Sequence, residues 1–296
     1  AEHDPRIVGI TAAMPSGTSL DMFADVYPDR CYDVGIAEQH AVTFAAGLAS
    51  HGLRPIVALY STFLQRAYDS VLHDVCLQNL PVTFALDRGG LVGADGPTHH
   101  GVFDLSYLRH IPNLTFMVPR NEEELRRAMV TALQAPGPFA YRYPRGKGVG
   151  CRLSDKPSPV EIGRGEKLRD GDDGVIFALG PAVEAALEAA QILDDEGLSF
   201  AVVDPRFLKP LDKDLLVAEA QRTGLVITVE ENVLAGGFGT AVLELFADAG
   251  VSSQILRLGL PDNFVEQGSQ DELRHLYHLD SIGIAGEIRG FPAISS

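Results

Sequence analysis

Residues 55–86, PIVALYSTFLQRAYDSVLHDVCLQNLPVTFAL, contain the pattern that decides the fold. The runs 55–60 and 81–86 are short and apolar, which predicts buried strands. Between them, apolar residues recur at helical spacing, and these are Leu64, Ala67, Tyr68, Val71, Leu72 and Val75. A strand, a helix and a second strand in this order predict parallel strands joined by a crossover helix.

The same alternation continues on both sides of this segment. Residues 6–11 read as a strand, and residues 37–52 read as a helix whose apolar side chains fall on one face. Asn121 followed by Glu124 is a capping pattern that opens a further helix. Residues 139–143 then close the first unit as a strand.

A second, smaller unit follows a stretch rich in glycine, proline and charge. Its predicted strands are 174–179, 200–204, 225–230 and 253–259, with helices between them. We therefore expect two consecutive α/β domains with mostly parallel sheets. The predicted boundaries are 1–148 for the first domain, 149–165 for the linker and 166–296 for the second domain.

Charge and composition exclude several classes of function. The formal net charge of −16 argues against a nucleic-acid partner, because such binding needs a basic face. No stretch reaches the roughly 20 apolar residues of a membrane helix, and no signal peptide is indicated. The three cysteines, Cys31, Cys76 and Cys151, form no CxxC pair, which argues against a disulfide framework. We expect a cytoplasmic protein without a membrane partner.

Two loops at predicted strand ends carry polar residues, where sheets of this class bind their ligands. Glu38 lies at a helix start, where the helix dipole alone would favour a carboxylate; proton transfer is the functional alternative. Tyr60 ends a strand, and Phe63 and Arg66 begin the next helix. A packed aromatic residue and a solvated arginine would give the same pattern.

A third loop, LDRGGLVGADGPTHHG (86–101), is long and rich in glycine. Loops of this length inside a domain are usually functional or disordered, and glycines let a backbone approach a ligand closely. The loop holds Arg88, Asp95, His99 and His100, which suit proton handling or a polar substrate. Adjacent histidines alone are weak spacing for metal ligands, so no metal site is predicted.

A fourth loop contains Arg142 and Arg145, which precede glycines. A guanidinium group offers a planar fork of donors that suits a phosphate, although surface charge beside a linker would look the same. Together the four loops favour a small anionic substrate.

These motifs resemble those of one family, the 1-deoxyxylulose-5-phosphate synthases. The similar segments are GIAEQHAV (35–42), YSTFLQRAYDSVLHDVCLQNLPV (60–82), DRGGLVGADGPTHHGVFDLSYLRHIPN (87–113), YRYPRG (141–146), DPRFLKPLD (204–212) and VEENVLAGGFG (229–239). The first four are similar to the family's pyrimidine-binding domain, and the last two resemble the C-terminal domain that it shares with transketolases. The resemblance is nearly continuous from about residue 6 to residue 290.

The resemblance implies roles for individual side chains. Glu38 would bond ring nitrogen N1′ of thiamine diphosphate and take part in acid–base catalysis, with Phe63 stacked on the pyrimidine and Arg66 beside it. The implied catalytic residues are Glu38, Asp95 and His99. The implied substrate-binding residues are Tyr60, Arg88, Asp95, His99 and Arg145, of which Tyr60 and the two arginines would hold a phosphate. His40 and His100 would only support the site.

The implied activity is that of a transferase, the decarboxylative condensation of pyruvate with glyceraldehyde 3-phosphate to 1-deoxyxylulose 5-phosphate. This reaction is the first step of non-mevalonate isoprenoid biosynthesis and also supplies thiamine biosynthesis. The family forms homodimers, with the active site between domains. The implied cofactors are thiamine diphosphate and Mg²⁺.

The sequence departs from the family in one respect. The family anchors the diphosphate and Mg²⁺ in an N-terminal domain with a GDG motif, and this sequence has no equivalent. GADG (93–96) belongs to the glycine-rich loop, and RDGDDG (169–174) reads as a turn. The resemblance therefore implies that the chain works with a separate N-terminal, diphosphate-binding part.

Two alternatives stay open. One is the β-type subunit of a two-chain thiamine diphosphate enzyme, such as a 2-oxoacid dehydrogenase E1 or a split transketolase; the DRGG and THHG segments favour the synthase. The other is a non-catalytic assembly module with the same fold. The dense set of polar loop residues argues against that module.

Overall fold

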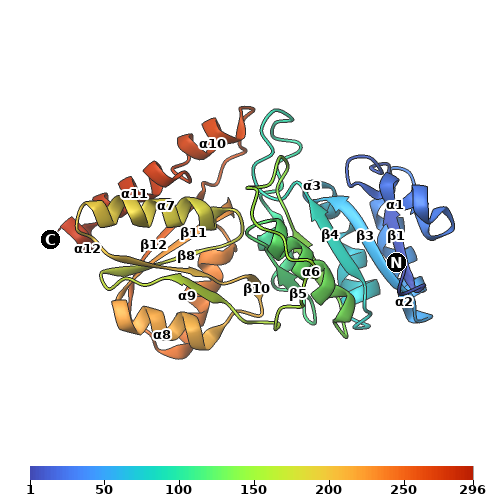
Figure 1. Cartoon of the computed structure of the whole chain (residues 1–296), viewed down its shortest axis with the longest axis horizontal. Helices are drawn as coiled ribbons and strands as arrows, with labels where there is room; N and C mark the ends of the chain where they lie inside the picture. The colour runs from blue at the N-terminus through green and yellow to red at the C-terminus, as the bar shows by residue number, and fades with distance from the viewer. Residues whose placement is uncertain (296) are drawn as a thin grey trace.

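The predicted alternation of strands and helices is present in the computed structural model, which describes residues 1–295 (Figure 1). The strands form one sheet of seven and one sheet of five. The two sheets lie side by side along the long axis, with the N-terminus in one domain and the C-terminus at the far end of the other (Figure 1). The prediction of two α/β domains with mostly parallel sheets is confirmed.

The first sheet has the strand order β10-β5-β6-β4-β3-β1-β2. Its strands are β1 (Ile7–Thr11), β2 (Cys31–Asp33), β3 (Arg54–Tyr60), β4 (Thr83–Asp87), β5 (Thr115–Met117), β6 (Phe139–Arg142) and β10 (Phe207–Lys209). All neighbours are parallel except β10, which runs antiparallel to β5. Strand β10 comes from the second half of the chain, so the first sheet is completed by a distant segment.

Helices of the first domain follow from local sequence signals. Helix α2 (Glu38–Ser50) buries an alanine-rich face that includes Ala41 and Ala45. In α6 (Glu122–Gln134), the predicted cap is present, because the Asn121 side chain accepts the Glu124 amide at 3.0 Å. The predicted helix over residues 64–75 is interrupted. It consists of α3 (Ser61–Leu64), η2 (Gln65–Ala67), α4 (Tyr68–Ser70) and the π-helical η3 (Val71–Cys76).

The second sheet has the order β12-β11-β8-β9-β7. Its strands are β7 (Glu166–Arg169), β8 (Gly174–Ala178), β9 (Phe200–Asp204), β11 (Leu225–Val233) and β12 (Gln254–Leu260). Its main helices are α7 (Ala182–Asp195), α8 (Lys213–Thr223), α9 (Phe238–Ala249), α10 (Gln270–Leu276) and α11 (Ser281–Gly290), followed by α12 (Pro292–Ser295). Only β7 is antiparallel to its neighbour.

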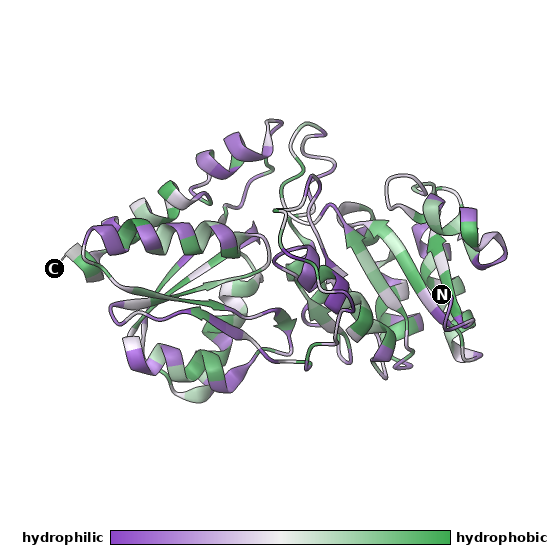
Figure 2. Ribbon diagram, in the orientation of Figure 1, coloured by the Kyte–Doolittle hydropathy of each residue, from purple (hydrophilic) through white to green (hydrophobic). Residues whose placement is uncertain are grey.

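Hydropathy matches this layered arrangement. In Figure 2 the strands of both sheets are mainly green, whereas the helices alternate between green and purple, as expected when one helix face covers a sheet. Strands β8 and β9 are buried along their whole length, which is typical of parallel strands covered on both faces. Among residues 1–295, no helix combines the length and apolarity needed to cross a membrane.

Several short elements lie outside the sequence prediction. All of them have seven residues or fewer, and they are helix α1 (Leu20–Val26), the 3₁₀ turn η1 (Pro28–Arg30), helix α5 (Asp104–Leu108) and strands β2, β5, β7 and β10. Strands β2, β5 and β10 and the turn η1 have three residues each, which are too few side chains to establish a period. Strand β7 has the mostly charged sequence EKLR and no apolar run. The domain boundaries drawn at 148 and 165 stay a prediction.

A cluster of ion pairs joins the two domains, and one of its members, Arg206, directly precedes β10. Arg120, which follows β5, contacts Glu166 at 2.9 Å and Asp204 at 2.8 Å. Arg206 contacts the same Glu166 at 2.6 Å and Glu124 of α6 at 3.1 Å. Asp204 is fully buried, and burial raises the pKa of its carboxyl to about 6 although Arg120 opposes the shift. The guanidinium of Arg120 is therefore the main counter-charge of a buried carboxylate.

Replacing Arg120 by methionine should destabilise the protein strongly. Removing one partner of a buried ion pair leaves an uncompensated charge, which costs about 3–5 kcal/mol. Thermal and urea unfolding at pH 8 would measure the loss. The matched control is Arg6→Met, which removes an exposed pair with Asp4 and should change stability far less. Equal effects of the two substitutions would contradict the importance of this cluster.

His100 also joins the domains, and it does so in its neutral form. The residue is 2% exposed. Its Nδ1 accepts the Val92 amide at 3.1 Å, so the proton lies on Nε2, which donates to the Glu266 carbonyl at 3.2 Å. Burial lowers the pKa of His100 below its usual value. A proton on Nδ1 would oppose the Val92 amide and break the first of these bonds.

The stabilising contribution of His100 should disappear at acidic pH. Because the folded-state pKa is lowered, the unfolded chain takes up a proton first as the pH falls below about 6.5, and the folded state loses stability. We expect the melting temperature of the wild type to fall more between pH 7.5 and pH 5.5 than that of His100→Gln. The exposed His40, replaced in the same way, serves as the control and should follow the wild type. Parallel curves for all three proteins would rule out this role.

Candidate active site

The polar loops of the first domain meet at the carboxyl edge of its sheet, as expected for parallel strands. Glu38 is the first residue of α2, and its side chain is only 3% exposed. It accepts a hydrogen bond on Oε1 from Nη1 of Arg66 at 2.9 Å. The Arg66 side chain is half exposed, so this pair brings a buried carboxylate to the edge of an open surface.

An aromatic group lies beside this pair. The guanidinium carbon of Arg66 is 5.1 Å from the centre of the Phe63 ring. Phe63 also stacks on Tyr60, with ring centres 5.7 Å apart and an angle of 18° between the planes. The ring of His99 meets Phe63 edge to face at 5.4 Å. The sequence-predicted residues Glu38, Tyr60, Phe63, Arg66 and His99 therefore form one connected cluster.

Arg88 extends the cluster at the end of β4 and is held in a strained conformation. Its φ of 59° is in the left-handed region, which costs energy for a residue with a side chain. The guanidinium carbon lies 3.6 Å from the centre of the Tyr60 ring. The same group pairs with Asp87 at 2.9 Å and donates to the Gly17 carbonyl. Strain of this kind persists where the surroundings require a side chain in one place.

Asp95 and Arg145 lie close to the cluster and contact each other at 3.0 Å. Both are more than a third exposed, and both influence the pKa of Tyr60, which is raised mainly by burial of its hydroxyl. The sequence predicts these two residues in one site but does not predict that they pair. A ligand with a negative charge would compete with Asp95 for Arg145.

The glycine-rich loop that carries Asp95 and His99 is closed at its base. The amide of Gly90 donates to the Gly101 carbonyl at 2.7 Å, and the amide of Gly101 donates back at 2.9 Å. Gly101 cannot be replaced without a shift of the backbone, because a Cβ there would lie 2.2 Å from the Arg88 carbonyl oxygen. A glycine is needed at position 101 because the backbone of Arg88 approaches it too closely to leave room for a side chain.

Three residues that the sequence analysis considered lie apart from the cluster. His40 is exposed and stacks on Phe44, and His100 is used internally as described above. Arg142 was considered for a phosphate, but the structure contradicts this interpretation. Its side chain is 3% exposed and forms an ion pair with the buried Asp104, so it is not accessible to a substrate.

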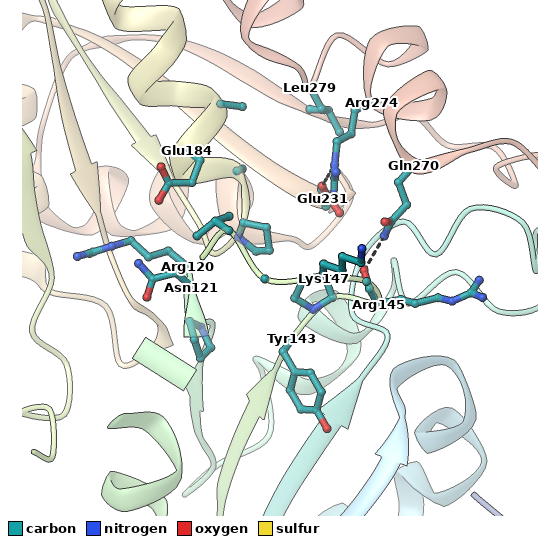
Figure 3. A pocket seen from close by; sticks show the side chains of 18 of the residues that line it. Arg120, Asn121, Tyr143, Arg145, Lys147, Glu184, Glu231, Gln270, Arg274 and Leu279 are labelled. Atoms are coloured by element: carbon teal, nitrogen blue, oxygen red, sulfur yellow. Dashed lines mark hydrogen bonds and ion pairs between the residues drawn. The ribbon is translucent and has the colours of Figure 1, made fainter. Parts of the chain in front are cut away.

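A cleft of about 540 Å³ lies between the domains, separate from the Glu38 cluster. Its walls are residues 143–149, the first turns of α6 and α7, and helices α10 and α11. Figure 3 shows Arg274 and Glu231 pointing toward one another in this cleft, where Arg274 Nε and Glu231 Oε1 are 2.6 Å apart. Arg145 contributes to the cleft wall, but its side chain extends away from the labelled cleft residues (Figure 3). Its Nη1 contacts Asp95 at 3.0 Å.

Two side chains of the second domain reach the glycine-rich loop, and sequence reasoning missed both. Oε2 of Glu231 accepts the Leu91 amide at 3.2 Å, and Nε2 of Gln270 donates to the Leu91 carbonyl at 2.6 Å. Glu231 belongs to the segment 229–239 that carried the resemblance, but nothing in its spacing indicates this contact.

The cluster has a defined chemical capacity. A buried carboxylate next to the face of an aromatic ring suits a planar heterocycle with a polar edge. The arginines and Tyr60 beside it suit an anionic group. Within residues 1–295, no group of three or more histidine, cysteine, aspartate or glutamate side chains could hold a metal ion.

Comparison with known proteins agrees with this arrangement. Residues 1–149 match the family described as transketolase, pyrimidine binding domain, and residues 163–284 match transketolase, C-terminal domain. A 1-deoxy-D-xylulose-5-phosphate synthase of Syntrophotalea carbinolica is 67% identical over 98% of this chain, and one of Geobacter metallireducens is 58% identical over 98%. The match covers 46% and 47% of those proteins, so the chain spans about half the length of the curated relatives.

Solved structures give the same result. A split-gene transketolase, described as an inactive β4 tetramer, matches with a TM-score of 0.87 at 31% identity, over 99% of this chain and 94% of that one. A transketolase of Campylobacter jejuni matches with a TM-score of 0.78 at 20% identity, over 96% of this chain and 44% of that one, and supports the fold alone. The chain therefore belongs to the transketolase family, as a pyrimidine-binding domain followed by a C-terminal domain, and within that family it is similar to the 1-deoxyxylulose-5-phosphate synthases.

Proposed function

We propose that this chain supplies the pyrimidine-binding half of the active site of a 1-deoxyxylulose-5-phosphate synthase. The reaction is the decarboxylative condensation of pyruvate with glyceraldehyde 3-phosphate. The observation that carries the proposal is the buried Glu38 carboxylate at the start of α2, held by Arg66 beside the ring of Phe63. The high identity to synthases from several bacteria supports the choice of reaction.

The residues present fit the aminopyrimidine part of thiamine diphosphate. Glu38 would accept a hydrogen bond from the ring nitrogen, and Phe63 would cover the flat face of the ring. When bound, thiamine diphosphate supplies the nucleophilic carbon that this reaction needs. Glu38, in its buried position, would hold or release a proton at the ring edge as the general acid–base group.

The substrate residues are assigned on the same basis. The guanidinium of Arg145 is more accessible than that of Arg88, and with Arg88 and Tyr60 it would bind the phosphate of glyceraldehyde 3-phosphate. Asp95 and His99 lie on the glycine-rich loop and would orient pyruvate or move protons. The pairing of Asp95 with Arg145 would then be exchanged for the phosphate on binding.

The diphosphate and Mg²⁺ would be held by a further part of the enzyme, as the resemblance implies. The match to about half of each synthase supports this division. It also accounts for a Glu38 cluster that lies apart from the large interdomain cleft, since an open half-site is enclosed only when the other half covers it. We further propose that the complete enzyme is a homodimer and cytoplasmic.

A β-type subunit of a two-chain enzyme is the second candidate. The match covers 99% of this chain and 94% of the split-gene transketolase chain, so the two chains have similar lengths. This similarity supports the alternative. Its identity of 31%, against 67% for the synthase of Syntrophotalea carbinolica, favours the synthase. The acceptor distinguishes the candidates: glyceraldehyde 3-phosphate with pyruvate as donor for a synthase, and a ketose donor or lipoamide for the alternatives.

Replacing Glu38 by glutamine should abolish most of the activity. A glutamine of the same shape has no ionisable group, and loss of general acid–base catalysis costs about 10²- to 10⁴-fold in rate. The assay is pyruvate-dependent carbon dioxide release with glyceraldehyde 3-phosphate, in the assembly of this chain with its diphosphate-binding part. Glu184→Gln, a glutamate of the interdomain cleft, is the control and should keep full activity. Full activity of Glu38→Gln would favour the non-catalytic assembly module.

Replacing Arg145 by methionine should weaken binding of the phosphorylated acceptor. Hydrogen bonds to charged groups contribute about 1.5–3 kcal/mol, so the KM for glyceraldehyde 3-phosphate should rise roughly 10- to 150-fold. The KM for pyruvate, and the rate with unphosphorylated glyceraldehyde, should change little. Lys147→Met, two residues away, is the control. An equal rise for both substrates would show that Arg145 does not recognise the phosphate.

A further inference from the structure

The part of the glycine-rich loop between Leu91 and Gly101 is held by contacts with the second domain. Leu91 uses both of its backbone polar groups on that domain, with its amide on Glu231 and its carbonyl on Gln270. The Leu91 side chain is fully buried in the core of the second domain. A loop that starts in one sheet is therefore anchored on the other.

Glu231 contacts one end of this loop directly and is connected to the other end through Arg142. Its carboxylate binds the Leu91 amide at one end. Its main-chain carbonyl accepts Nη2 of Arg142 at 3.0 Å, and Nη1 of the same guanidinium donates to the Gly101 carbonyl at 3.1 Å at the other end. The second carboxylate oxygen is held by Arg274. Because Glu231 is only 4% exposed, these contacts are made in a dry environment, where they are stronger than on the surface.

Gln270 connects the loop to Arg145. Its amide nitrogen donates to the Leu91 carbonyl at 2.6 Å. It also donates to the Arg145 carbonyl at 3.1 Å (Figure 3). Gln270 is the first residue of α10, and the preceding Ser269 forms a capping box with Glu272 that fixes the start of this helix. One side chain therefore sets the distance between the glycine-rich loop and the segment that carries Arg145.

We propose that Glu231 and Gln270 are positioning residues: from the second domain, they hold Asp95, His99 and Arg145 in the geometry that the reaction needs. This inference rests on the proposed function for its catalytic part, whereas the anchoring of the loop does not. A misplacement of about 1 Å in an active site can cost about 10²-fold in rate, so anchors outside the site control turnover. Neither residue touches the reacting atoms, and both act through the loop.

The first test is hydrogen–deuterium exchange of residues 91–101 in this chain, with Gln270→Ala and Gln270→Glu. Glutamate has nearly the shape of glutamine but cannot donate to either carbonyl, so both variants should raise exchange in the loop about fivefold or more. Glu231→Gln weakens the contacts with Arg274 and with the Leu91 amide, so it should also raise exchange in the loop. Glu184→Gln is the control, because Glu184 lines the same cleft and its side chain forms no hydrogen bond or ion pair with residues 1–295.

The second test is kinetic and uses the assembly with its diphosphate-binding part. The Gln270 variants should raise the KM for glyceraldehyde 3-phosphate about tenfold, as a shift of Arg145 requires, while the melting temperature stays close to that of the wild type. A variant that only destabilises the fold would lower the melting temperature and leave the KM of the folded fraction unchanged.

The outcomes separate this inference from the proposed function. Unchanged exchange in the Gln270 variants, or faster exchange with unchanged KM values, would overturn the positioning role. If Glu38→Gln and Arg145→Met leave activity intact, the proposed function fails, and the exchange result still decides whether the second domain anchors the loop.

Discussion

Arg142 is a charged side chain buried where the two domains meet, and several elements of both domains supply its hydrogen-bond and ion-pair partners. Its guanidinium, 3% exposed, pairs with the fully buried Asp104 and donates to the carbonyls of Gly101 and Glu231. An isolated charge in such a place would be very costly, so each of these partners has to be in position. The glycine-rich loop, α5 and β11 supply these partners to Arg142 on β6, and the relative placement of the four segments is therefore tightly constrained.

The arginines at the candidate active site are also paired with carboxylates. The chain is strongly acidic, but Arg66, Arg88 and Arg145 gather at the carboxyl edge of the first sheet. Each is held by a carboxylate, namely Glu38, Asp87 or Asp95. These pairs keep the cations oriented without a ligand. The exposed pair of Arg145 with Asp95 is more easily exchanged than the largely buried pair of Arg88, because solvent screens it.

The fold and the central cluster could be predicted from sequence because their signals are local. Apolar runs and helical stripes give the strand–helix alternation, and the carboxyl ends of parallel strands bring Glu38, Phe63 and Arg88 to one edge. The contacts of Leu91 with Glu231 and Gln270 span 140 and 179 residues, and no local pattern encodes them. Arg142 was misread for the same reason, since its partner Asp104 lies 38 residues away and burial cannot be read from its neighbours.

Strand β10 has a consequence for how such chains can be recombined. The family-matched segments end at residue 149 and resume at residue 163, which makes the intervening stretch look like a natural junction. Yet residues 207–209 return to the first sheet as its edge strand beside β5 (Figure 1). A chimera that takes its second domain from another relative would therefore also exchange one strand of the first domain. The unit of exchange is therefore larger than either sheet, because the second part of the chain supplies an edge strand to the first sheet.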